Sequence, residues 1–112
     1  MVFQITLYVL KLRKPGYYYI GTTTRPFKLR MEEHLDGGGC IWTSRYGLAD
    51  DPIVEKYICK NGTASREENE VTERYMKKFG WKGVRGGDYM NCKEDGSTWW
   101  LPAGFPGSSR RS

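Results

Sequence analysis

The start of the chain constrains the fold most, because it carries two strand-like segments joined by a tight-turn signal. Residues 3–9 alternate apolar and polar side chains, which is the period of a strand with one buried face. The turn signal Pro15-Gly16 follows, and the tyrosine-rich residues 17–21 form a second β-prone segment. The sequence therefore predicts an antiparallel hairpin, whose register these residues leave open.

A helix is expected directly after this hairpin. Thr24 is the candidate N-cap, and Pro26 lies in the first turn, where proline is tolerated. Apolar side chains then recur every four residues, which predicts one buried stripe along the helix. These residues are Phe27, Met31 and Leu35.

The same helix is expected to present two polar side chains together. Arg30 and His34 are four residues apart and therefore share a face beside the apolar stripe. Residues 36–39 read Asp-Gly-Gly-Gly and are expected to end the helix.

The second half of the chain predicts one more strand and one more helix. Residues 40–52 are expected to form a loop, and residues 53–59 a short strand. Ser65 and Glu68 have the spacing of a capping box, which predicts a helix start, and Gly80 is the expected end. The apolar face of this helix is expected to hold Val71, Tyr75, Met76 and Phe79. The predicted fold is α/β (α+β), with a short, about three-stranded antiparallel β-sheet flanked by helices.

Length and composition predict a single domain. With 112 residues, the chain has room for one core, expected over residues 1–94. Residues 95–112 are rich in Trp, Gly, Pro and Ser and are expected to form a C-terminal tail, partly docked or disordered. No apolar run approaches the ~20 residues of a membrane span, and no signal peptide is evident. An intracellular location, cytoplasmic or nuclear, is therefore expected, without a membrane partner.

Charge and cysteine content narrow the expected partners. Lys and Arg number 18 against 13 Asp and Glu, a net charge of +5, and sixteen aromatic side chains accompany them. This balance favours a polyanionic partner, by default nucleic acid. Cys40, Cys59 and Cys92 are odd in number, which favours reduced thiols. Because their spacing does not fit the usual pairs of zinc ligands, a zinc site that they share with His34 is disfavoured.

Taken together, several of these residues resemble the GIY-YIG nuclease family. The second half of the family motif stands intact as Tyr19-Ile20-Gly21, and Tyr8 is the tyrosine that remains of the first half, where the sequence reads Thr-Leu-Tyr. Arg30 and His34 follow on a helix, and a glutamate opens the next helix. The resemblance covers roughly residues 5–90.

The resemblance implies a metal-dependent endonuclease that hydrolyses DNA phosphodiester bonds. Arg30 would hold the scissile phosphate, Tyr8 or Tyr19 would help to activate the water, and His34 would lie in the site. The implied cofactor is one Mg²⁺ or Mn²⁺ ion, held mainly by Glu68. Mg²⁺ keeps several waters, so a single carboxylate together with a substrate phosphate suffices. Glu67 and Glu70 are the competing carboxylates, and Glu68 could instead simply cap its helix.

The expected macromolecular partner is DNA, in a setting of repair or recombination. Five basic residues are candidate nucleic-acid contacts: Lys28, Arg45, Lys77, Lys82 and Arg85. The family's further asparagine has no clear counterpart, and Asn91 or Arg85 would replace it. A protein partner or a homodimer is expected to assist targeting. The alternative is a non-catalytic basic module that binds nucleic acid.

Overall fold

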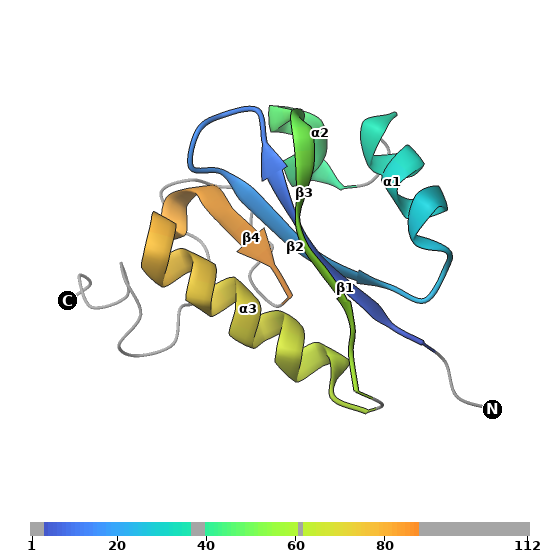
Figure 1. The fold of residues 1–112 in the computed structure, drawn as a ribbon. Coiled ribbons are helices and arrows are strands. Elements are labelled where there is room, and N and C mark those ends of the chain that lie inside the picture. The colour runs from blue at the N-terminus through green and yellow to red at the C-terminus, as the bar shows by residue number, and fades with distance from the viewer. Residues whose placement is uncertain (1–3, 37–39, 61, 88–112) are drawn as a thin grey trace.

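The protein forms a four-stranded mixed sheet with helices on both faces. A computed structural model describes residues 4–36, 40–60 and 62–87 (Figure 1). The strand order is β3-β1-β2-β4, and β4 pairs with β2 in parallel while the other pairs are antiparallel. The strands are β1 (Thr6–Leu12), β2 (Tyr18–Thr23), β3 (Leu48–Ile58) and β4 (Val84–Gly86). The predicted α+β class is confirmed, and the sheet has one strand more than the about three expected, the parallel β4.

The predicted hairpin is present as β1 and β2. Its turn is closed by hydrogen bonds from the Leu12 amide to the Tyr17 carbonyl, at 2.9 Å, and from the Tyr17 amide to the Lys14 carbonyl, at 3.1 Å. Gly16 has a φ of 80°, which favours glycine at that position. The register, left open by the sequence, pairs Tyr8 with Gly21.

The expected loop over residues 40–52 was wrong. Residues Ile41–Tyr46 form the short helix α2, and β3 already begins at Leu48. Its eleven residues lie at an edge of the sheet, where Pro52 removes a backbone donor at little cost.

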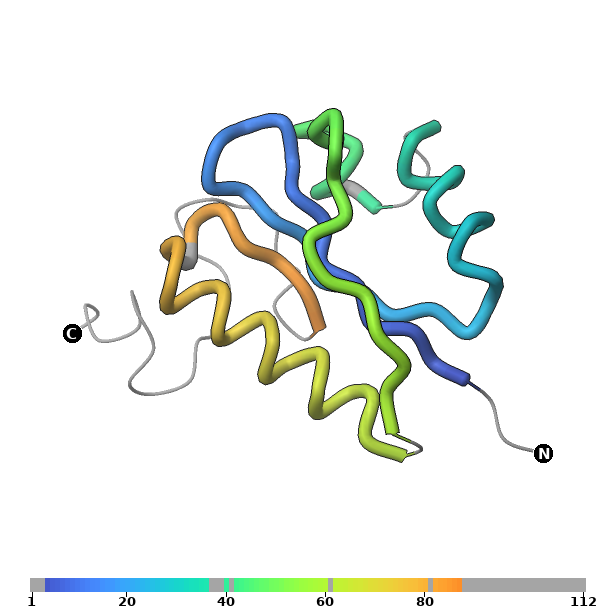
Figure 2. The backbone as a smooth tube through the Cα atoms, viewed as in Figure 1, coloured from blue at the N-terminus to red at the C-terminus, as the bar shows by residue number. Residues whose placement is uncertain are grey.

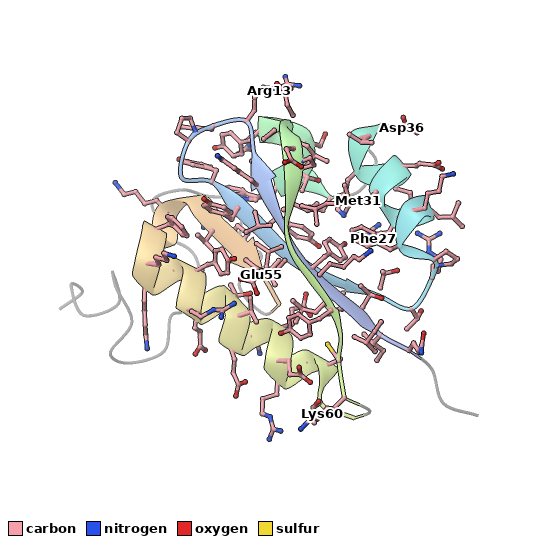
Figure 3. All side chains as sticks on the ribbon, viewed as in Figure 1. Arg13, Phe27, Met31, Asp36, Glu55 and Lys60 are labelled. Carbon is pink, nitrogen blue, oxygen red and sulfur yellow. The ribbon has the colours of Figure 1, made fainter. Side chains whose placement is uncertain are left out.

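The first helix, α1, spans Phe27–Leu35, and its N-cap is Pro26 instead of Thr24. The predicted apolar stripe is only partly correct. Met31 is buried, whereas Leu35 is 65% exposed, and His34 takes the buried position at this end of the helix. Figure 3 shows Phe27 and Met31 directed from α1 toward the sheet.

The second long helix, α3, spans Ala64–Phe79 and ends at Gly80, as predicted. Its N-cap is Thr63, and the predicted capping box was wrong in register. The carboxylate of Glu67 accepts hydrogen bonds from the Thr63 hydroxyl and, at 3.2 Å, from the Lys60 amide. Glu67 therefore ties the preceding turn to the start of the helix, whereas Ser65 lies inside the helix and is not its N-cap.

Two cores lie on opposite faces of the sheet. The backbone trace shows α3 along one face and α1 with α2 across the other (Figure 2). The α3 face is apolar, with Leu7, Val9, Ile20 and Met76 at its centre. A short 3-10 turn (Trp81–Gly83) links α3 to β4. No helix among the described residues is long and apolar enough to span a membrane. The expected tail lies outside the described residues.

Candidate active site

The candidate site is centred on the hydroxyl of Tyr8, a fully buried side chain of β1 on the face covered by α1 and α2. The guanidinium Nε of Arg30 donates to this hydroxyl at 3.2 Å, and Nε2 of His34 lies 3.0 Å from it. Because one helical turn separates Arg30 from His34, both reach the same oxygen. The structure thus brings together three of the predicted site residues.

Tyr19 lies beside this cluster, and Gly21 makes room for it. The Tyr19 ring centroid is 6.2 Å from that of Tyr8 and 5.3 Å from that of His34. A Cβ on Gly21 would lie 2.7 Å from the Tyr8 hydroxyl oxygen and 2.8 Å from a Tyr19 ring carbon. Any larger residue would therefore displace the two tyrosines, which gives the Tyr-Ile-Gly triplet a physical reason.

His34 is neutral near pH 7. Burial, together with the nearby charge of Arg30, lowers the pKa of His34 to about 4. Its second ring nitrogen, Nδ1, lies 3.1 Å from the hydroxyl of Thr43, a buried residue of α2. The imidazole is therefore held at both nitrogens.

The two tyrosines are protonated at rest. Burial raises the pKa of Tyr8 above 10.0, although the hydrogen bond from Arg30 acts against this shift. Burial also raises the pKa of Tyr19. Because the pKa of Tyr8 is raised and that of His34 is lowered to about 4, the neutral phenol–imidazole pair is favoured over a phenolate–imidazolium pair at rest. A proton can pass from Tyr8 to His34 only when positive charge gathers at the phenol oxygen.

An ion-pair network holds Arg30 at the mouth of the site. Nη1 of Arg30 donates to the carboxylate of Glu33 at 2.8 Å, and Arg25 pairs with the same carboxylate. Hydrogen bonds from Arg25 and Arg30 lower the pKa of Glu33 to about 2. Burial acts against the charged form of Arg30, but its bonds to Glu33 and Tyr8 outweigh this effect and raise its pKa.

A pocket of about 480 Å³ opens beside Arg30. Hydroxyl groups of the β2 end and basic side chains of α1 and its approach form much of its wall. The residues that argue for an anionic ligand are Thr22, Thr23, Thr24, Arg25, Arg30 and Ser65. Several hydroxyl and guanidinium donors around one space favour a phosphate group there.

Glu68 is half-buried in the first turns of α3. Burial is the main cause of the raised pKa of Tyr8 and of Tyr19, and the negative charge of Glu68 adds a small contribution in the same direction. The two competing carboxylates have different surroundings, because Glu67 binds the Thr63 hydroxyl and the Lys60 amide while Glu70 is exposed.

A single carboxylate, that of Glu68, is the candidate protein ligand for a divalent cation, and it fits a hard cation whose other ligands are mostly water. The described residues include no cluster of three or more His, Cys, Asp and Glu side chains. A single carboxylate suits Mg²⁺, which binds proteins through one or two carboxylates and keeps its remaining waters. Cys40 and Cys59 pack in the cores of opposite faces, so they do not share a site, and Cys92 lies outside the described residues.

The basic candidates do not form one surface. Lys28 and Arg45 are exposed on α1 and α2, while Lys77 and Lys82 are exposed on α3 and the turn after it. These elements belong to opposite faces of the sheet.

Arg85 was wrongly predicted as a nucleic-acid contact. It is fully buried and donates to the carbonyl oxygens of Lys82, at 3.1 Å, and Val84, at 2.9 Å. Its guanidinium carbon lies 4.3 Å from the ring centroid of Trp42. The surface exposure that a phosphate contact requires is absent, and the side chain braces β4 against α2. Asn91 lies outside the described residues.

Sequence reasoning missed Glu33 and Thr43. Glu33 could have been found, since it lies three residues after Arg30 on a predicted helix, at ion-pairing distance. Thr43 carried no comparable signal, because its helix was not predicted. Searches against family models, curated proteins and solved structures found no match for this chain.

Proposed function

We propose that this protein is a metal-dependent endonuclease that hydrolyses DNA phosphodiester bonds. One observation carries the proposal: a buried phenol is held between a guanidinium and a neutral imidazole, beside a pocket lined by donors. A tyrosine that only packs does not need two ionisable partners at its hydroxyl. The resemblance to the GIY-YIG nucleases supports the same conclusion, because the same residues carry it.

Arg30 is proposed to hold the scissile phosphate. Arg30 lines the pocket, and its Nε donates to the Tyr8 hydroxyl, so one side chain would connect a phosphate bound in the pocket to the phenol. Planar guanidinium donors match phosphate oxygens and stabilise the charge that develops in the transition state. In this proposal a bound phosphate competes with Glu33 for the guanidinium donors and draws Arg30 toward the pocket. This movement would give the attacking water access to the Tyr8 hydroxyl.

Tyr8 and His34 are proposed to move one proton during the attack of water. The water oxygen forms its bond to phosphorus and releases a proton to the Tyr8 oxygen, while the Tyr8 proton passes to Nε2 of His34. The bond to the leaving oxygen breaks, and that oxygen takes a proton from solvent. Tyr8 is favoured over Tyr19 for this role because the Tyr8 hydroxyl contacts His34.

Glu68 is proposed to hold the divalent cation. When bound, the ion would supply positive charge near the phenols and the phosphate, which favours the phenolate. The free thiols of Cys40 and Cys59 support an intracellular setting for this chemistry.

A non-catalytic nucleic-acid-binding module is the second candidate. The observation that favours it is the complete burial of Tyr8 and its raised pKa, which suit a structural phenol. This candidate keeps DNA binding and needs neither Glu68 nor a metal.

A nuclease assay separates the two candidates. The substrates are supercoiled plasmid, linear duplex, single strands and a branched DNA, each with Mg²⁺, Mn²⁺ or EDTA. Wild type is expected to cut in the presence of metal, and Glu68→Gln to lose on the order of 10³-fold in rate because only the metal-binding charge is removed.

Glu67→Gln is the matched control for this assay. It makes the same chemical change one residue away and weakens the hydrogen bonds to Thr63 and Lys60, which should cost about 1 kcal/mol of stability without loss of cleavage. Cleavage by Glu68→Gln at the wild-type rate would contradict the assignment of Glu68. Binding without cleavage by the wild type on every substrate would favour the non-catalytic module.

A further inference from the structure

Among the residues that the structure describes, the hydroxyl proton of Tyr8 has one acceptor. The side chain is fully buried, so this proton requires a partner within the protein. Arg30 Nε–H only donates, and Nε2 of His34 is the other atom bonded to this oxygen. Tyr8 therefore donates to His34, and Nε2 must carry no proton.

The proton of the neutral imidazole then lies on Nδ1. This N–H donates to the Thr43 hydroxyl at 3.1 Å, and the Thr43 hydroxyl donates in turn to the Cys40 carbonyl at 3.3 Å. The Cys40 sulfur lies 3.4 Å from the same hydroxyl and accepts from the Thr43 amide at 3.5 Å, which caps α2. The start of α2 thus holds the orientation of Thr43.

We propose that Thr43 is a positioning residue that selects the Nδ1–H tautomer of His34, so that Nε2 stands ready to accept the proton of Tyr8. The hydrogen bonds then run in one direction from Arg30 through Tyr8, His34 and Thr43 to the Cys40 carbonyl. With the other tautomer, Nε2–H would donate to the Tyr8 oxygen and could not take its proton. The tautomer is a property of the resting protein, and its effect on cleavage rests on the proposed function.

The geometry also suits the imidazolium that forms after transfer. Both of its N–H groups keep an acceptor, the side-chain oxygen of Tyr8 and the hydroxyl oxygen of Thr43. No ring flip or side-chain rotation is needed, because the proton moves along an existing hydrogen bond. Thr43 never touches the reacting phosphate in this account and acts through His34 alone.

His34 is the only histidine in the chain, so its ring can be observed without overlap. The experiment labels the imidazole with ¹⁵N and determines the tautomer by NMR at pH 7 in wild type, Thr43→Ser and Thr43→Val. Serine keeps the hydroxyl, whereas valine has nearly the same shape and lacks it. Wild type and Thr43→Ser are expected to show Nδ1–H, and Thr43→Val to gain a large Nε2–H population.

Single-turnover cleavage supplies the second measurement. Thr43→Val is expected to be slowed at least about tenfold and Thr43→Ser to stay within about threefold of wild type, because the wrong tautomer blocks transfer. An Nε2–H tautomer in the wild type, or an unchanged tautomer in Thr43→Val, would overturn the proposal. The wild-type spectrum alone decides the tautomer, even if Thr43→Val fails to fold or the wild type cuts no DNA.

Discussion

The two faces of the sheet are built on different principles. The α3 face buries apolar side chains such as Leu7, Val9 and Met76, and its contacts are non-directional. The α1/α2 face buries Tyr8, His34 and Thr43 with their polar atoms joined in one hydrogen-bonded chain. Figure 3 shows Glu55 of β3 turned toward α3. A buried polar group costs free energy unless it is paired. The hydrogen-bonded polar side chains of this face are therefore expected to add little to stability compared with its apolar side chains, such as Leu10 and Trp42.

This difference assigns separate tasks to the faces. The α3 face is expected mainly to supply stability, whereas the α1/α2 face is proposed to hold reactive groups in fixed protonation states, with Glu68 of α3 as the exception. Substitutions on one face should therefore affect stability with little effect on turnover, and substitutions on the other should affect turnover first.

The largest expected effect is on turnover. Arg30→Ala should lower the cleavage rate by 10²–10³-fold, the usual loss when a donor to a developing charge is removed. Arg74→Ala is the matched control, since Arg74 also pairs with a glutamate, Glu55, but lies outside the pocket and has no bond to Tyr8. Steady-state kinetics would reject the assignment if the two variants lost activity equally.

The apolar face should respond in stability instead. Met76→Ala removes a fully buried side chain of α3 and should cost about 2–5 kcal/mol in the free energy of unfolding. Turnover per folded molecule should stay within about twofold. Leu35→Ala, at an exposed position of α1, should change stability by less than about 0.5 kcal/mol. A large loss of turnover in folded Met76→Ala would contradict the assignment of stability to the α3 face and of turnover to the α1/α2 face.

A third expected effect is on the pH dependence of stability. The pKa of His34 is lowered from 6.5 to about 4, so the unfolded chain binds the extra proton first on acidification. Stability from this group is full above pH 6.5 and falls by roughly 3 kcal/mol as the pH drops toward 4. Denaturant titrations between pH 7 and pH 4.5 should show this slope in wild type and a flatter one in His34→Gln. Equal slopes would mean that His34 is not held neutral.

Sequence patterns predicted the parts of the fold that depend on local signals. The Pro15-Gly16 turn defined the hairpin, and α3 followed from its long apolar period. The six-residue α2 is too short for a period to show, and β4 is three residues that contain Arg85 and a glycine. Only pairing with β2, far away in the sequence, makes β4 a strand.

Most residues of the candidate site were predicted from the sequence, but the hydrogen bonds that connect them were not. Arg30 and His34 were expected on one helix face, but the hairpin register decides that Tyr8 meets them. The burial of Arg85 under Trp42 is a tertiary contact that a basic residue in a sequence does not reveal. Thr43 likewise depends on how α2 packs against α1.

The most direct test of the central claim is the single-turnover cleavage rate of Tyr8→Phe, measured with Mg²⁺ beside wild type and Tyr19→Phe. The substitution removes only the hydroxyl that contacts Arg30 and His34. We predict a loss on the order of 10²-fold for Tyr8→Phe, the lower end of general acid–base catalysis, and a smaller loss for Tyr19→Phe. A folded Tyr8→Phe protein that cuts DNA at the wild-type rate would contradict the account.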